Sequence, residues 1–346
     1  MSLPPSEIPL GAIRFNSDSQ KLEYWMGSAW FQIQTFSPNL AESTDGAAGT
    51  RGIWSGQAQW VSSPYNSSVI DAVSLASQGN TFDFGDNTEA RRGGGQCASN
   101  TRALLAGGFN NSGNRSNTID FITISSTGNG TDFGDRTTVG NAVAAAGNQT
   151  RGVFLGASTP SSTNIIDFVT IASTGNAVDF GDATNTNNNN TGFGSPTRGI
   201  FGANGPNGNV MFITYATTGN ATDFTNFTHG RTELPAGGSN STRGIYAGGE
   251  RQPSGTSVNT IDFMTISSLG DFTNFGDLTK LIRGAGGAAS PTRLVIAGGS
   301  NPDSPNGFNS IEFVTFSTQG NAVDFGDLTL AKHAYNGTSN GHGGLG

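Results

Sequence analysis

The sequence predicts an all-β fold built from repeated four-stranded units. Gly supplies 52 of the 346 residues, only 12% are charged and Lys occurs three times, so the chain has little from which to build amphipathic helices. The dipeptide Thr-Arg recurs six times at intervals of 45 to 51 residues, and the apolar runs that follow it keep the same phase. The second of these runs in each repeat alternates with period two, which favours strands over disorder.

Each repeat contains three apolar runs and one run of small residues. The first follows the arginine, as at 103–108, and the second, as at 118–126, leads through a Ser-Thr-Gly-Asn turn to a third run ending in Phe-Gly-Asp. A run of small residues precedes the next Thr-Arg, as at 278–290. Four strands in about 49 residues match the size of a propeller blade. The repeated arginines are Arg51, Arg102, Arg151, Arg198, Arg243 and Arg293.

Counting the strands predicts a closed ring. Six copies of the last three strands are present, but the small-residue run before Arg51 is degenerate. The C-terminal segment 328–343 aligns with that run, and we expect it to lie beside 50–56 and so to pair an edge that would otherwise be exposed. Residues 39–346 are therefore expected to form a six-bladed β-propeller with four-stranded blades, closed by the C-terminal strand.

The repeat resembles kelch repeats over roughly residues 40–346. Kelch blades have an arginine-bearing inner strand, an apolar strand ending in Gly-Gly and a last strand with an aromatic anchor. The Gly-Gly pairs here are at 107–108, 248–249 and 298–299. Phenylalanines stand where kelch repeats usually carry tryptophan, at Phe84, Phe133, Phe180, Phe224, Phe275 and Phe325. The resemblance implies a kelch-like propeller in which these rings fill the space between blades and the following Gly-Asp turns to the next.

Residues 1–38 lie outside the repeat and predict a small β module of three strands joined by turns at 16–19 and 26–28. Such a module is barely stable alone, so its aromatic residues need a surface to pack against. They either pack on this chain's own propeller and on each other, or dock the module to another subunit or a larger assembly. The candidate docking residues are Phe15, Tyr24, Trp25, Trp30 and Phe31.

The N-terminal pattern is similar to a short module of tailed-bacteriophage structural proteins, often fibre or appendage proteins. It consists of Gly-Ala-Ile-Arg-Phe-Asn at 11–16, Leu-Glu-Tyr-Trp at 22–25 and Trp-Phe-Gln-Ile at 30–33. The Asn/Gly/Thr-rich repeats with Asp-Phe-Gly-Asp endings also resemble those of cyanophages. The resemblance implies a virion component on a tail or head appendage, bound to other virion proteins through the module. A homo-oligomer, with a trimer as the usual state of a fibre, is expected.

Charge and residue types exclude several other classes. The net charge of −8 argues against DNA or RNA as a partner, and no apolar run reaches the roughly 18 residues of a membrane span. Cys97 is the only cysteine, so no intrachain disulfide forms, and we expect it to be an inert buried thiol on an inner strand. The histidines His229, His333 and His342 lack metal-ligand spacing, so neither a metal nor a cofactor is expected.

The chain is also not expected to be an enzyme. Asp-Phe-Gly occurs in kinases, but here it recurs with the repeat, and no Gly-rich loop, strand lysine or His-Arg-Asp accompanies it. Neither a Gly-x-Ser-x-Gly motif nor a paired-carboxylate cleft stands out. Calcium bound by acids such as Asp132 and Asp135 stays open as an alternative, although their spacing fits no known calcium loop.

The repeated arginines are expected to have a structural role. An acid recurs in the second run, and Met211 breaks that series. We expect each arginine to form a bidentate link with an acid between strands or blades. The acids are Asp71, Asp120, Asp167, Asp262 and Glu312.

The loops after the second strand are the most irregular parts of each repeat, and chain order places all of them on one face of the ring. Variable loops on a rigid scaffold commonly carry recognition, and aromatic and arginine side chains are typical anchors. These side chains either contact a ligand or host surface, or only pack the loop tips. They are Trp60, Tyr65, Phe109, Arg115, Arg251 and Phe308.

The expected function is that of a non-enzymatic phage virion protein, a tail or head fibre or appendage component whose propeller face contacts host surface glycan or neighbouring subunits. A purely structural capsid or tail decoration protein without a ligand is the first alternative. A glycan-acting enzyme is the second.

Overall fold

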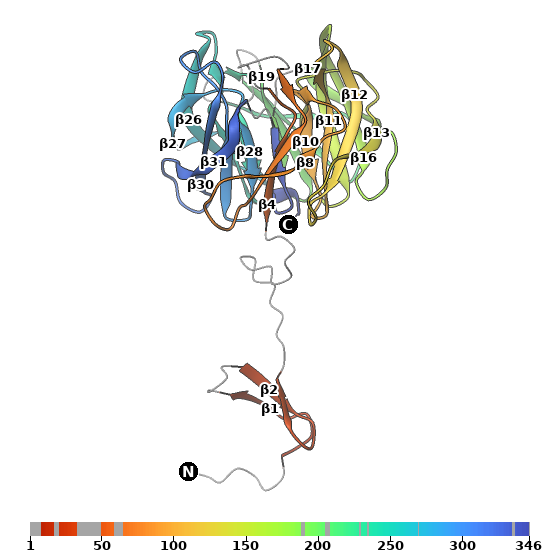
Figure 1. The fold of residues 1–346 in the computed structure, drawn as a ribbon, viewed down its shortest axis with the longest axis vertical. Coiled ribbons are helices and arrows are strands. Elements are labelled where there is room, and N and C mark those ends of the chain that lie inside the picture. Colours follow the sequence, from red (N-terminus) through yellow and green to blue (C-terminus); the bar gives the residue numbers. More distant parts are fainter. Residues whose placement is uncertain are drawn as a thin grey trace. The chain divides into compact units, whose positions relative to one another are not determined.

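The computed structural model describes residues 8–16, 21–32, 50–58, 65–187, 191–204, 208–227, 230–233, 235–268, 270–333 and 336–345. In these residues every regular element is a strand, apart from one 3-10 turn, η1 (Gly343–Leu345). The chain forms two compact units, Met1–Thr44 and Asp45–Gly346 (Figure 1). The all-β prediction is confirmed, and the many four-stranded antiparallel sheets of the second unit are consistent with a β-propeller.

The first unit contains one antiparallel sheet of order β1-β2-β3, which we call the N-terminal sheet. Its strands are β1 (Ile13–Asn16), β2 (Lys21–Trp25) and β3 (Trp30–Gln32). Ile13 lies opposite Tyr24, which in turn lies opposite Phe31, so these three side chains share one face.

Six sheets of the second unit contain a path of four antiparallel strands in the described residues, and we number them I to VI. Sheet I is β32 (Asn336–Ser339), β4 (Arg51–Ser55), β7 (Val69–Ser74) and β8 (Phe82–Asp86). Sheet II is β10 (Gly95–Ala98), β11 (Arg102–Asn110), β12 (Arg115–Thr123) and β13 (Thr131–Asp135), with β9 (Arg91–Arg92) beside β11. Sheet III is β14 (Ala144–Gly147), β15 (Arg151–Thr159), β16 (Ser161–Thr170) and β17 (Val178–Asn187).

Sheet IV is β18 (Thr191–Gly194), β19 (Arg198–Asn204), β20 (Asn209–Thr214) and β21 (Thr222–Asn226). Sheet V is β23 (Ala236–Ser239), β24 (Arg243–Ala247), β26 (Thr256–Thr265) and β27 (Thr273–Ile282), extended by β25 (Glu250–Arg251) and β22 (Arg231–Thr232). Sheet VI is β28 (Gly286–Ala289), β29 (Arg293–Ala297), β30 (Phe308–Thr315) and β31 (Val323–Lys332). A short pair, β5 (Gln57–Ala58) and β6 (Asn66–Ser67), extends from sheet I.

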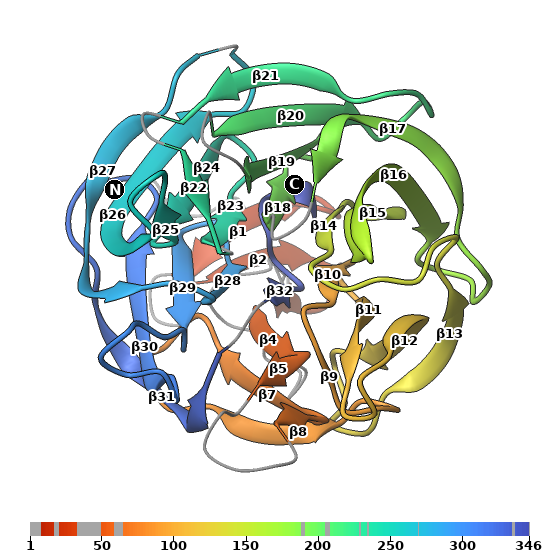
Figure 2. The ribbon, with the colours of Figure 1, turned by 90° about the horizontal axis from the view of Figure 1, so that it is seen from above.

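The first strands of the six sheets contact one another in cyclic order, β10, β14, β18, β23, β28, β32 and back to β10, around a common centre (Figure 2). Small residues allow this close approach, because Gly and Ala dominate these strands. Strand β32 pairs with β4 in antiparallel register, with Gly337 opposite Trp54. The C-terminal segment therefore lies where the sequence analysis placed it, beside Arg51–Ser55.

The hydrophobic cores lie between consecutive sheets. Phe133 of sheet II, for example, packs with Leu104 of its own sheet and with Phe154 of sheet III. Its ring also meets Phe121 on the adjacent strand edge-on, with 5.9 Å between ring centroids. The aromatic anchor of each repeat is buried in a corresponding cluster. The interpretation that these rings fill the space between sheets is confirmed.

The Gly-Asp of Phe-Gly-Asp does not make a turn, contrary to the sequence analysis. Both residues lie within the fourth strand, as in β13. Gly134 instead faces the Ser-Thr-Gly-Asn turn of the next sheet, where a Cβ would lie 2.6 Å from the carbonyl carbon of Gly175. Asn176 of that turn accepts a hydrogen bond from the Asp135 amide at 3.0 Å. Glycine is required here because the neighbouring backbone lies against the strand.

Sheet IV shows the same contact built from other residues. Thr225 stands where the five other sheets have this glycine, and the next turn carries Asp271 where the other turns have asparagine. The Thr225 hydroxyl donates to Asp271 Oδ1 at 2.8 Å. The two residues on facing sheets therefore differ from the repeat together, because they form one contact.

Candidate functional site

The repeated arginines do not pair with the repeated acids, so that prediction is wrong. Arg102 donates through Nη1 to the Ile171 carbonyl of the next sheet at 3.0 Å and lies 4.7 Å from the centroid of the Phe121 ring. The register explains the difference, because Arg102 begins its strand while Asp120 lies opposite Leu105, three residues further along. The other five make equivalent bonds, from Arg51 to Ile124, Arg151 to Tyr215, Arg198 to Ile266, Arg243 to Phe316 and Arg293 to Ala76.

These arginine bonds form a closed series. Each joins one sheet to the next, and the bond from Arg293 to the Ala76 carbonyl joins sheet VI to sheet I. Five of the arginines lie over the phenylalanine that follows the repeated acid or, in sheet IV, Met211. In sheet I this position is Ala72, and Arg51 lies 6.0 Å from the centroid of Phe82 instead. The arginines are thus structural, through carbonyl and aromatic contacts.

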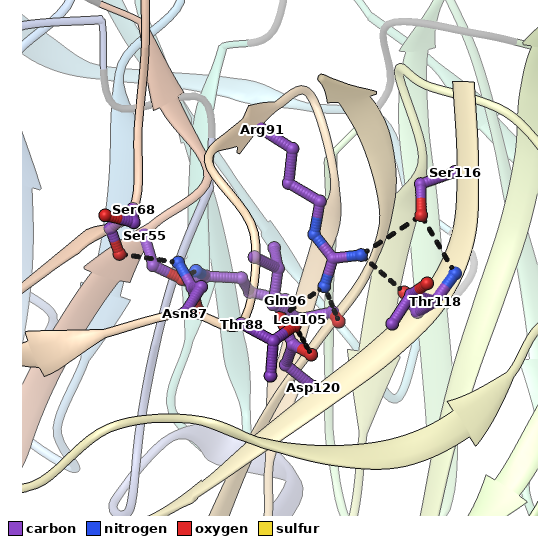
Figure 3. Close-up of polar contacts among 10 residues, drawn as sticks. All are labelled: Ser55, Ser68, Asn87, Thr88, Arg91, Gln96, Leu105, Ser116, Thr118 and Asp120. Carbon is purple, nitrogen blue, oxygen red and sulfur yellow. Dashed lines mark hydrogen bonds and ion pairs between the residues drawn. The ribbon is translucent and has the colours of Figure 1, made fainter. Parts of the chain in front are cut away.

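The buried acids bind cations from the segment that leaves the preceding sheet, as Figure 3 shows for Asp120 and Arg91. Asp120 accepts from Arg91 Nη2 at 2.7 Å and from the Thr88 hydroxyl at 2.6 Å. The corresponding pairs are Arg136 with Asp167 at 3.0 Å, Arg231 with Asp262 at 2.5 Å and Lys332 with Asp71 at 2.7 Å. Glu312 accepts from the amide and hydroxyl of Thr279, and Met211 replaces the acid in sheet IV.

These cations were not predicted from the sequence, although a signal was present. Arg91, Arg231 and Lys332 each stand five residues after the last residue of Phe-Gly-Asp or its variant Phe-Thr-Asn. Arg136 reaches the equivalent acid from the position directly after Asp135. Burial raises the pKa of Asp120 and lowers that of Arg91, and the attraction between the two charges only partly opposes both shifts. The pairs lock neighbouring sheets and are not exposed to a ligand.

The loop between β11 and β12 carries two of the predicted contact residues. Phe109 is half-buried and follows the buried part of β11, with the Arg92 guanidinium 5.1 Å and the Arg115 guanidinium 6.0 Å from its ring centroid. Arg115 is exposed and donates from Nε to Asn141 Oδ1 at 3.0 Å. We call Arg92, Phe109 and Arg115 the arginine cluster.

The arginine cluster is connected to the loop of sheet I. The Asn66 side chain donates from Nδ2 to the Phe109 carbonyl at 2.8 Å and accepts from Arg92 Nη1 at 3.0 Å. The backbone carbonyl of Asn66 accepts a hydrogen bond from Asn111 Nδ2 at 3.2 Å. Tyr65, directly before Asn66, is 46% exposed. Sequence reasoning did not select Arg92, Asn66 or Asn111, although the pair Arg91-Arg92 stands out in a chain so poor in cations.

The remaining predicted contact residues are distributed over other parts of the chain. Arg251 is exposed on β25 of sheet V, and Phe308 is half-buried on sheet VI with Lys280 Nζ 5.0 Å from its ring centroid. Trp60 lies outside the described residues. The structure therefore brings Phe109 and Arg115 together, beside Tyr65, while Arg251 and Phe308 belong to sheets V and VI.

The centre of the ring holds a cavity of about 30 Å³, lined mainly by Gly and Ala of the first strands. This volume accommodates water but no larger ligand. His342 borders the cavity, donates from Nε2 to the Ala98 carbonyl at 2.8 Å and accepts the Gly344 amide at Nδ1 at 3.1 Å. Gly343 and Gly344 lie so close to backbone carbonyls of neighbouring sheets that neither has room for a Cβ. The C-terminal segment thus packs across this cavity.

Other candidate groups are placed as follows. Cys97 is buried on β10, as predicted, and burial raises the pKa of its thiol to about 12. His333 is buried, with Nε2 2.8 Å from the Pro305 carbonyl, and His229 lies outside the described residues. Within the described ranges, no group of three or more His, Cys, Asp or Glu side chains, including Asp132 and Asp135, is arranged to hold a metal ion.

No protein-family model matches the chain. No curated protein matches it either. In the part of the chain that the structure describes, no helix is long and apolar enough to cross a membrane.

Proposed function

We propose that this protein is a non-enzymatic binding protein of a phage virion, in which a six-bladed, kelch-like β-propeller presents a face of variable loops. The N-terminal module, residues 1–38, attaches this propeller to a tail or head appendage. The attribution to a virion is supported by the sequence resemblance of the module and of the repeats.

The six four-stranded sheets support the proposed number of blades. Their first strands touch in cyclic order, and the arginine bonds run from each sheet to the next until Arg293 reaches sheet I. The pairing of β32 with β4 joins the two ends of the second unit within one sheet. A ring held in this way provides a rigid base for loops, which favours recognition over conformational switching.

The arginine cluster is the observation that carries the binding proposal. It places two guanidinium groups beside one aromatic ring in a chain of net charge −8. Arginine binds carboxylates and phosphates through paired donors, and an aromatic ring packs against the apolar face of a sugar. The ligand class that fits is an acidic surface glycan of the host, such as the phosphorylated part of a lipopolysaccharide.

The experiment measures binding of the purified full chain to cyanobacterial cells and to lipopolysaccharide extracted from them. Arg115→Gln is expected to weaken binding at least tenfold, whereas Arg102→Gln, with the same charge change at the opposite end of sheet II, leaves the affinity of the folded protein unchanged. Equal affinity of both variants would refute a binding role for the arginine cluster.

A decoration protein without a ligand is the second candidate. It is favoured by hydrogen bonds that already hold the loop side chains, such as those from the Asn66 backbone amide to Asn111 Oδ1 and from Arg115 Nε to Asn141 Oδ1. Retention of the chain in virions that depends on residues 1–38, together with absence of cell binding by the wild type, would support this candidate.

A further inference from the structure

Residues 341–345, which we call the axial plug, lie across one end of the cavity at the centre of the ring. They follow β32 and include η1. His342 lines the cavity, and η1 contacts β18 of sheet IV and β23 of sheet V. Gly344 lies against the Gly147 carbonyl at the end of β14 in sheet III. One short segment therefore bridges the ends of several first strands.

The axial plug is held by few side-chain contacts. Three of its five residues are glycine, and a Cβ on Gly343 would collide with the carbonyls of Gly194 and Asn240. With so little apolar surface, burial contributes little to its attachment. Among the described residues, the one hydrogen bond from the plug to another sheet runs from His342 Nε2 to the Ala98 carbonyl of sheet II, at 2.8 Å. The attachment of the plug therefore depends on the state of one imidazole ring.

Both nitrogens of the His342 ring are engaged, in opposite senses. Nε2 donates, because the Ala98 carbonyl only accepts, and Nδ1 accepts the Gly344 amide at 3.1 Å. These two bonds require the neutral ring with its proton on Nε2. A second proton on Nδ1 turns that acceptor into a donor that faces the Gly344 N–H, so this bond is lost.

The strands around the plug do not compensate a positive charge on His342. The six first strands carry no charged side chain, and their one titratable group is Cys97, whose pKa of about 12 keeps it a neutral thiol. The charged residues that begin the following strands are the repeated arginines, which are themselves cations. Burial lowers the pKa of His342, and its bond to Ala98 only partly opposes this shift. Protonation therefore opposes the docked position of the plug.

Closure of the ring does not depend on the plug. Strand β32 pairs with β4, and Asn340 Oδ1 accepts the Arg51 amide at 2.7 Å. The Ser339 hydroxyl donates to the Ala289 carbonyl of sheet VI. All of these contacts precede Gly341, so the plug has a place to turn away from the cavity while β32 stays in its sheet.

We propose that the axial plug is an acid-released lid: neutral His342 holds it across the end of the central cavity, and protonation of His342 releases residues 341–345 while the ring stays closed. Release uncovers the cavity, which is lined mainly by Gly and Ala of the first strands, at the end where these strands finish. It also removes a segment that links sheets II to V. Because docking lowers the pKa of His342, docking is favoured above the ordinary histidine pKa of about 6.5 and weakens as pH falls below it.

Hydrogen–deuterium exchange of the full chain, read by mass spectrometry and corrected for the intrinsic pH dependence of amide exchange, tests the proposal. Between about pH 7.5 and about pH 5, protection of residues 342–345 is expected to fall about tenfold in the wild type, while β32 and β12 keep theirs. In His342→Gln, whose amide donates to Ala98 but does not titrate, protection of 342–345 is expected to be the same at both pH values. A wild-type plug whose protection is independent of pH, or that loses it together with β32, overturns the proposal.

A second variant covers the case in which glutamine does not hold the plug. Gly343→Ala, whose Cβ has no room against Gly194 and Asn240, is expected to lower protection of 342–345 at neutral pH to the level of the acidified wild type. Protection of β12 is expected to stay unchanged. A Gly343→Ala variant with a fully protected plug, or one that also loses β32, overturns the proposal.

The N-terminal sheet belongs to the other compact unit and serves as an internal reference. Phe15, Tyr24 and Phe31 lie on one of its faces, and the Trp25 and Trp30 rings are 5.5 Å apart. Its exchange is expected to be the same in the wild type and in His342→Gln at each pH. Differences confined to residues 342–345 therefore support the lid, and differences spread over both units contradict it.

Discussion

The buried pair of Arg91 and Asp120 provides a quantitative test of how the sheets are held together. Both side chains are at most 1% exposed. Asp120→Asn removes the negative charge and leaves the Arg91 guanidinium in the interior. That guanidinium keeps three neutral acceptors, the carbonyls of Leu105 and Thr118 and the hydroxyl of Ser116, so part of its charge remains solvated by the protein.

The expected cost follows from these contacts. Breaking a buried ion pair by removing one partner typically costs about 3–5 kcal/mol. Because three acceptors remain, we expect the lower end, about 3 kcal/mol, for Asp120→Asn. Burial raises the pKa of Asp120 and lowers that of Arg91, so it disfavours the charged form of both partners. The free energy of unfolding of the double variant Arg91→Met with Asp120→Met is therefore expected to stay within about 1 kcal/mol of the wild type. Sheet IV provides the natural precedent, because Met211 occupies the acidic position.

The assay is urea unfolding at neutral pH, followed by fluorescence of the buried Trp54 and by circular dichroism. The free energies of the wild type, both single methionine variants and the double variant form a double-mutant cycle. Two results would refute the reasoning: a cost below about 1 kcal/mol for Asp120→Asn, or a double variant as unstable as the single ones.

Two further predictions concern glycine contacts and the C-terminal segment. Gly134→Ala is expected to cost about 2 kcal/mol more than Gly175→Ala, because both have positive φ but only the former brings a Cβ against backbone; equal costs in thermal unfolding would contradict this. Burial lowers the pKa of His342, so its stabilising contribution is present above its ordinary pKa of about 6.5 and is lost as pH falls below it. The wild type is therefore expected to lose more stability on acidification than the His342→Gln variant. Burial also lowers the pKa of His333, but His333 is present in both proteins and does not affect the comparison. Identical pH profiles of the free energy of unfolding would exclude a contribution of His342.

Much of the local structure was predictable because the repeat determines it. Period-two runs and Gly-Asn turns depend on neighbouring residues, so the strands around 119–124 and the hairpin that follows them were found without tertiary information. The alignment of 328–343 with the inner strands likewise anticipated β32 beside β4. The candidate contact residues were only partly predictable: Phe109 and Arg115 lie together, but the contribution of Arg92 through a third segment was not foreseen.

By itself, the sequence determined the all-β class, the repeated strands and the positions of the buried aromatic rings, because backbone preferences and alternating burial act over a few residues. Only the tertiary structure determined which group each charged side chain contacts. Arg102 faces a carbonyl of the next sheet and not Asp120, and Asp120 receives Arg91 from the segment before its own sheet. These pairs join residues of different repeats where two sheets face each other, so the spacing of the residues along the chain does not specify them.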